Sequence, residues 1–146
     1  MMVADPESMS AYRCFQDLSE EQRREVAQLA EDECLYPGQT LFREGDPSEA
    51  IFLLRSGNVE ILYNIGEEGP AKVDTVSGEQ ILGCSALVEP YTYTSTARSL
   101  SEIETMIIDA AALRKLMVED QSLGYTIQKQ IIRMLLDRII DLRLGC

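Results

Sequence analysis

Turn signals recur along this chain at short intervals, and they leave room only for short strands between them. Glycine or proline marks each turn, and the turns are Pro37-Gly38, Gly45-Asp46-Pro47, Ser56-Gly57-Asn58, Gly66-Glu67-Glu68-Gly69-Pro70 and Ser77-Gly78. Short apolar runs lie between these turns, at residues 40–42, 51–54, 59–63 and 72–76. Short strands separated by regularly spaced turns predict an all-β sandwich or barrel.

Two further strands are predicted on the C-terminal side of these turns. Residues 91–96 read Tyr-Thr-Tyr-Thr-Ser-Thr, which is typical of a strand with two unlike faces. Tyr91 and Tyr93 would share an aromatic face, and the threonines would line the other. This tyrosine row has two open interpretations, a retuned pocket or ordinary β packing. Residues 105–108 close the β region.

Helical patterns flank the β region on both sides. Ser19 and Gln22 form a capping-box pattern, which predicts a short helix from about residue 20 to residue 30. Asp109 is the predicted N-cap of a second short helix, and a longer helix is predicted over about residues 123–143. The predicted fold class is therefore mainly β with flanking helices.

The length and charge of the chain limit its organisation and its partners. Its 146 residues make one ordinary domain, which we assign to residues 15–146 after an N-terminal tail at residues 1–14. The 25 acidic and 13 basic residues give a formal charge of −12, so direct binding of nucleic acid or of an anionic membrane is not expected. No signal peptide or membrane span is visible, and a cytoplasmic location is expected.

The chain contains no histidine, which excludes Ser-His-Asp and Cys-His catalysis and every histidine-based metal site. The four cysteines, Cys14, Cys34, Cys84 and Cys146, form no C-x-x-C pair. We interpret them as free thiols of a cytosolic chain. Because no constellation of acid, base and nucleophile is visible, we expect no enzymatic activity and no metal site.

An ordered set of glycines carries a family resemblance. The residues are Pro37-Gly38, Gly45-Asp46, Ile51-Phe52-Leu53-Leu54 and Gly57-x-Val59. This frame resembles the cyclic nucleotide-binding domain, the sensor module of Crp/Fnr-type bacterial regulators and of cyclic-nucleotide-dependent kinases and channels. The resemblance extends from Phe15 to about Arg143. It implies a double-stranded β-helix, or jelly-roll β-roll, with an N-terminal helix and a long C-terminal helix. An unrelated cupin-type jelly roll is the alternative, although cupin metal centres rely on histidine.

The resemblance implies a ligand site, the phosphate-binding cassette, late in the β-roll. In the family a glycine opens a short helix, a glutamate holds the ribose hydroxyl and an arginine pairs with the cyclic phosphate. The implied ligand-binding residues here are Gly83, Cys84, Ser85, Ala86, Leu87, Tyr93, Thr94 and Ser95. Gly83, Ala86 and Leu87 match the family pattern, but Cys84 stands at the glutamate position and Tyr93 at the arginine position.

These departures predict weakened or altered nucleotide binding. The loss of one partner of a buried charge pair costs roughly 2–5 kcal/mol. The candidate ligand is a cyclic nucleotide, cAMP or cGMP, or another small molecule. Arg98 could replace the arginine only if a β-bulge turned it, because on a regular strand it would face away from Tyr93. Cys84 has two interpretations, a reactive thiol of lowered pKa at a helix start or an inert buried residue.

The predicted C-terminal helix carries an apolar stripe that suits a homodimer. Its seam residues, spaced alternately by three and four, are Ile132, Leu135, Ile139 and Leu142. The basic residues of this helix indicate either a solvated face or an acidic partner, and they are Lys129, Arg133, Arg138 and Arg143.

Two hypotheses about function follow from the sequence. The first is a ligand-sensing regulatory module with weakened or altered nucleotide specificity, in which ligand capture moves the C-terminal helix. The second is a dimeric interaction module that keeps the fold but has lost cyclic-nucleotide binding. The sequence does not distinguish between them, and it does not identify the ligand or the downstream effector.

Overall fold

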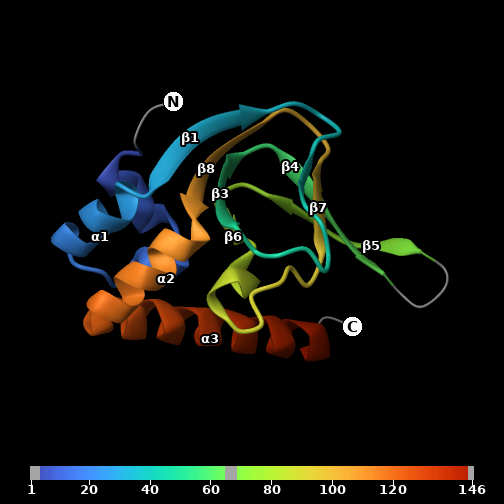
Figure 1. Ribbon diagram of the computed structural model, residues 1–146. Coiled ribbons are helices and arrows are strands. Elements are labelled where there is room, and N and C mark those ends of the chain that lie inside the picture. The colour runs from blue at the N-terminus through green and yellow to red at the C-terminus, as the bar shows by residue number, and fades with distance from the viewer. Residues whose placement is uncertain (1–3, 65–68, 145–146) are drawn as a thin grey trace.

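The fold is a β-roll built from two four-stranded antiparallel sheets, with helices along one side (Figure 1). It is seen in a computed structural model that describes residues 4–64 and 69–144, apart from the side chains of residues 70, 72, 73 and 141–144. One sheet has the strand order β1-β8-β3-β6 and the other has the order β2-β7-β4-β5. The predicted jelly-roll class with flanking helices is confirmed.

The strands are short, as the turn spacing predicts. Their bounds are β1 (Ala30–Leu35), β2 (Thr40–Phe42), β3 (Ala50–Ser56), β4 (Asn58–Asn64), β5 (Pro70–Ser77), β6 (Gln80–Leu82), β7 (Thr96–Ser99) and β8 (Ile103–Asp109). The helical elements are η1 (Pro6–Ala11), η2 (Arg13–Phe15), α1 (Glu20–Ala27), η4 (Cys84–Leu87), α2 (Ala110–Glu119) and α3 (Gln121–Leu144). The predicted turn at residues 66–70 lies partly outside the described residues.

Strand β3 separates two hydrophobic cores. Ile51 and Leu53 belong to the core between the first sheet and the helices. Phe52 and Leu54 belong to the core inside the roll. Successive side chains of a strand point to opposite faces, so a strand buried on both faces is a continuous apolar run, and residues 51–54 show that pattern.

The N-terminal segment is not a free tail. Met9 and Cys14 are fully buried in the core under the helices, and Tyr12 is nearly so. The hydroxyl of Tyr12 donates a hydrogen bond to the carbonyl oxygen of Leu54 at 2.8 Å. The apolar side chains of η1 and η2 cover the outer face of the first sheet, so this segment is part of the domain.

Two predicted elements differ from the structure in their extent. Helix α1 ends at Ala27, because the chain enters β1 at Ala30 instead of continuing the helix to that residue. Of the predicted strand at residues 91–96, only Thr96 belongs to a regular strand, as the first residue of β7, and residues 91–95 have one isolated bridge, between Thr92 and Pro47. Their backbone bonds to the turn at residues 45–48 in place of a neighbouring strand. Strands β1 and β6 lie where no strand was predicted.

Helix α3 runs along the side of the roll (Figure 1), and it contacts α2 and η2. Asp109 caps α2 as predicted, since its Oδ2 accepts the amide of Ala112 at 2.8 Å. An ion pair of 2.7 Å joins Arg138 of α3 to Asp74 of β5. Among the residues that the structure describes, no helix is both long enough and apolar enough to cross a membrane.

Gly124 lets the first turn of α3 approach α2 closely. A Cβ atom built at Gly124 would lie 2.6 Å from the carbonyl oxygen of Met117. Alanine at an ordinary helix position is more favourable than glycine by about 1 kcal/mol. We expect the opposite here, a loss of about 1–3 kcal/mol in the free energy of unfolding for Gly124→Ala, because the helices must move apart. Urea denaturation measures this loss.

Ser122→Ala is the matched control for this prediction, because Ser122 is exposed on the same turn of α3. We expect its free energy of unfolding to stay within about 0.5 kcal/mol of the wild type. A Gly124→Ala protein as stable as the control would contradict the close contact with Met117.

Candidate functional site

The cassette begins with a glycine whose backbone conformation and surroundings both favour the absence of a side chain. Gly83 has a φ of 84°, in the left-handed region, and it precedes the short helix η4. A Cβ atom at this position would lie 3.3 Å from both the carbonyl oxygen of Ala50 and Cε1 of Tyr93. The structure therefore brings Gly83 close to Tyr93 and to the start of β3.

The side chain of Tyr93 is packed inside the roll. Its hydroxyl donates to the carbonyl oxygen of Ala50 at 2.7 Å and accepts the amide N–H of the same residue at 3.1 Å. Its ring stacks on that of Phe42, with centroids 4.3 Å apart and planes 15° apart. Burial raises the pKa of the Tyr93 phenol, so the group is neutral near pH 7. A neutral, doubly hydrogen-bonded ring thus stands at the position where the sequence resemblance predicts the family's arginine.

Cys84 does not have the environment of a reactive thiol. Burial raises its pKa to about 11, and a backbone hydrogen bond lowers it by less. The thiolate is the reactive form, so at neutral pH almost all of the side chain is in the unreactive thiol form. The hypothesis of a lowered pKa at a helix start is therefore contradicted. The structure favours the inert interpretation.

The remaining cassette residues differ in their exposure. Ala86 is fully buried, Ser85 and Ser95 are half-buried, and Thr94 is exposed. Within the described part of the chain, the hydroxyl groups of Ser85, Thr94 and Ser95 form no hydrogen bond. They remain available to a ligand, but the ring of Tyr93 occupies the interior of the roll beside Gly83.

Arg98 does not replace the missing arginine. Its Nε donates to Oε1 of Glu60 at 2.7 Å, across the regular pairing of β7 with β4. The adjacent Ala97 is fully buried in the core inside the roll, so Arg98 points to the other face of the strand. The bulge that would have turned Arg98 toward Tyr93 is absent from this pairing.

Tyr91 and Tyr93 do not form the predicted aromatic row. Tyr93 is inside the roll, whereas the ring of Tyr91 lies outside it beneath the guanidinium carbon of Arg114, at 4.4 Å. Nη1 of Arg114 also donates to the carbonyl oxygen of Ala86 at 2.6 Å. Arg114 therefore connects α2 to the cassette. Sequence reasoning missed it, because one arginine on an amphipathic helix carries no distinguishing signal.

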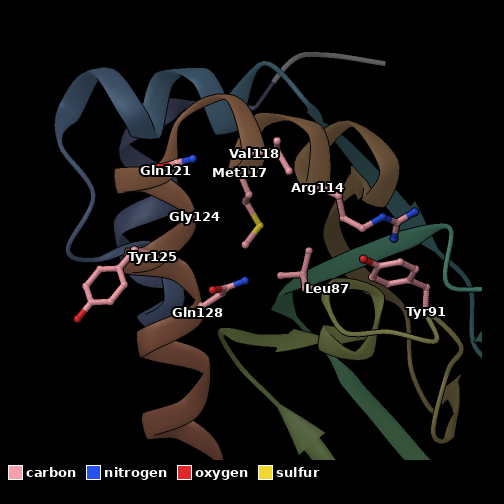
Figure 2. A pocket seen from close by; sticks show the side chains of 9 residues that line it. All are labelled: Leu87, Tyr91, Arg114, Met117, Val118, Gln121, Gly124, Tyr125 and Gln128. Carbon is pink, nitrogen blue, oxygen red and sulfur yellow. The ribbon is translucent and has the colours of Figure 1, made fainter.

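A cavity of about 310 Å³ lies between the cassette and the two helices α2 and α3. Figure 2 shows Leu87, Met117 and Gln128 pointing into it, whereas Tyr125 points away. Three other cavities, of about 970, 510 and 280 Å³, lie elsewhere on the described structure. None of these four cavities is lined by Gly83 or Tyr93, so none opens at the predicted phosphate position.

Comparisons with known proteins agree with this fold. Residues 33–120 match the family model of the cyclic nucleotide-binding domain. A solved structure of a "Putative Cyclic nucleotide-binding protein" from Geobacter metallireducens GS-15 has a TM-score of 0.83 and 30% identity, covering 93% of this chain and 98% of that chain. A cyclic nucleotide-binding domain from Methylobacillus flagellatus KT has a TM-score of 0.80 and 17% identity, covering 95% and 83%.

A curated relative, the "CRP-like cAMP-activated global transcriptional regulator" of Mycobacterium tuberculosis, is 27% identical over 103 residues, which is 70% of this chain and 44% of the relative. A "Putative potassium channel protein" of Rhodopseudomonas palustris is 24% identical over 120 residues, 82% of this chain and 28% of the relative. The chain thus spans less than half the length of these two relatives.

The two hydrogen bonds of Tyr93 with Ala50 predict the effect of Tyr93→Phe. The phenyl ring keeps its stacking on Phe42, but the N–H and C=O of Ala50 lose their hydroxyl partner. We expect the free energy of unfolding to fall by about 1–3 kcal/mol, measured by urea denaturation. Tyr36→Phe is the control, because Tyr36 is 72% exposed, and it should change stability by less than about 0.5 kcal/mol. Equal effects of the two changes would contradict the role of the hydroxyl.

Proposed function

Because the chain belongs to the cyclic nucleotide-binding domain family, we propose that it is a regulatory module whose cassette binds ordinary cyclic nucleotides only weakly. One observation carries the proposal: the phenol of Tyr93 is hydrogen-bonded to both backbone groups of Ala50 inside the roll. A nucleotide phosphate at this position would have to displace a buried ring whose hydroxyl already has a hydrogen-bond donor and a hydrogen-bond acceptor.

Electrostatics supports the same proposal. The cyclic phosphate is an anion, and the chain carries a formal charge of −12. Arg98 is paired with Glu60, and the guanidinium of Arg114 lies outside the roll over Tyr91. The loss of a buried charge partner costs roughly 2–5 kcal/mol, or about 30-fold to a few thousand-fold in affinity.

The curated relatives support a regulatory role for the domain. They are named as a transcriptional regulator and a potassium channel protein, and each is more than twice as long as the matched segment. We propose that this domain likewise passes a signal to an effector and does not itself catalyse a reaction. A cytoplasmic location fits such a role.

Restoring the two family residues tests the proposed cause of weak binding. We expect the wild type to bind cAMP and cGMP with dissociation constants of about 1 mM or weaker, measured by isothermal titration calorimetry. The double variant Cys84→Glu with Tyr93→Arg should bind at least about 30-fold more tightly, because it regains the ribose acceptor and the phosphate cation.

Tyr93→Ala is the matched control for this test, since it empties the same space without adding a charge. It should gain less than the double variant, and thermal melting shows whether each variant is folded. Micromolar binding of cAMP or cGMP by the wild type would overturn the proposal.

We further propose that α3 forms a homodimer by pairing with the same helix of a second copy. The predicted seam is not buried within one chain, because Ile132, Leu135 and Ile139 are 58%, 57% and 49% exposed. The opposite side of the helix packs on the domain through Leu123 and Ile127. The side chain of Leu142, the fourth seam residue, lies outside the described residues.

Leu135→Glu tests the dimer. A charge at the centre of the seam should shift the protein from dimer to monomer, because two carboxylates would be buried without partners. Sedimentation velocity measures the shift. Arg133→Glu is the control, since Arg133 lies about 100° around the helix from Ile132 and should leave the dimer intact. A monomeric wild type would contradict this proposal and leave the proposal about the cassette unaffected.

A further inference from the structure

The exposed seam of α3 continues beyond Ile132 toward the N-terminus of the helix. Seam residues follow one another at alternating intervals of three and four, and counting back from Ile132 in the same way gives Gln128, Tyr125 and Gln121. All three of these residues are exposed, as the rest of the described seam is. The surface that is proposed to pair with a second copy therefore includes the first two turns of α3.

A cavity lies on this N-terminal part of the seam. It is the cavity of about 310 Å³ between the cassette and the helices α2 and α3. The residues that line it from α3 are Gln121, Gly124, Tyr125 and Gln128. Relative to Tyr125, these are positions i−4, i−1, i and i+3. In a parallel, in-register coiled coil, those four positions of the facing helix form the hole that receives the seam residue i.

The other walls of the cavity suit a tyrosine ring, which has an apolar body and a polar end. Leu87 of the cassette and Met117 of α2 point into the cavity, and so does Gln128 (Figure 2). The two apolar side chains can pack on a ring, and the amide of Gln128 can form a hydrogen bond with a phenol hydroxyl. A volume of about 310 Å³ is at the lower end of the range for small-molecule sites, which is enough for one ring.

Tyr125 is the aromatic side chain that the seam presents to a second copy. The residue is 66% exposed, and its side chain points away from the cavity of its own chain (Figure 2). Nζ of Lys129, on the same helix, lies 5.9 Å from the centre of its ring. Tyrosine is enriched among the residues that contribute most to binding at protein interfaces, where it fills a pocket of the partner.

We infer that the homodimer is parallel and that Tyr125 of each copy inserts into the cavity of the other. The inference rests on the proposed homodimer and adds its direction, its register and its anchor residue. The pairing must be parallel and in register, because only then does Tyr125 face the same turn of the second helix. A twofold axis makes the contact occur twice. Since Leu87 lines the cavity, the cassette of each copy is in direct contact with the other copy.

NMR contacts between copies test the insertion. A deuterated chain with ¹³C-labelled methyl groups is mixed with an unlabelled chain, so that mixed dimers form. We expect nuclear Overhauser effects between the methyl groups of Leu87 and Met117 in the labelled copy and ring protons in the unlabelled copy. Tyr125→Ser in the unlabelled chain should remove them. A dimer without these contacts overturns the insertion and leaves the homodimer proposal intact, whereas a monomeric wild type overturns both.

The dissociation constant of the dimer, from sedimentation velocity over a range of concentrations, gives an independent test. Tyr125→Ser should raise this constant at least about tenfold, because each dimer loses two inserted rings. Tyr36→Ser makes the same change at a tyrosine that is 72% exposed and follows β1, and it should leave the constant within about twofold of the wild type. Thermal melting shows that both variants are folded. Dimers of equal strength in the two variants would contradict the inference.

Discussion

The burial of strand β3 on both faces is the constraint on which the rest of the structure depends. Ile51 and Leu53 hold the helices against the first sheet, while Phe52 and Leu54 fill the interior of the roll. Tyr12 bonds the N-terminal segment to the end of this strand, and Tyr93 bonds the cassette to its beginning. A change in β3 would therefore affect the N-terminal cover, the core of the roll and the candidate site together.

At the candidate site, a neutral interaction stands where the sequence resemblance predicts a charged one. An arginine inside the roll is stabilised only when an anion is bound, because an unpaired buried charge is costly. The phenol of Tyr93 needs no ligand, since Ala50 supplies both a donor and an acceptor. In the proposed function, a tyrosine at this position thus both removes the phosphate partner and makes the empty site stable. Cys84, with its raised pKa, adds no charge to replace the lost one.

Much of the fold could be predicted from the sequence because glycine and proline mark the turns between short apolar runs. The capping residues Ser19 and Asp109 likewise located two helix starts. Strand β1 was missed because it is an edge strand rich in acidic residues, without an alternating apolar pattern. The predicted aromatic row is wrong because residues i and i+2 share a face only on a regular strand, and the backbone of Tyr91 is in the left-handed region. The contact of Arg114 with Ala86 is tertiary, so no local pattern reveals it.

A ligand that binds the cassette from inside the roll pays a different free-energy cost from one that binds it from outside. Inside the roll, a ligand must first break the contacts of Tyr93 with Ala50 and Phe42, which reduces its apparent affinity by the free energy of that change. Outside, Arg114 and Tyr91 are already positioned, and a ligand can bind without displacing a buried ring. Arg114 is also bonded to Ala86 within η4, so a ligand that changes its geometry acts on the cassette directly. A ligand at the outer face would therefore meet a lower energetic cost than a ligand inside the roll.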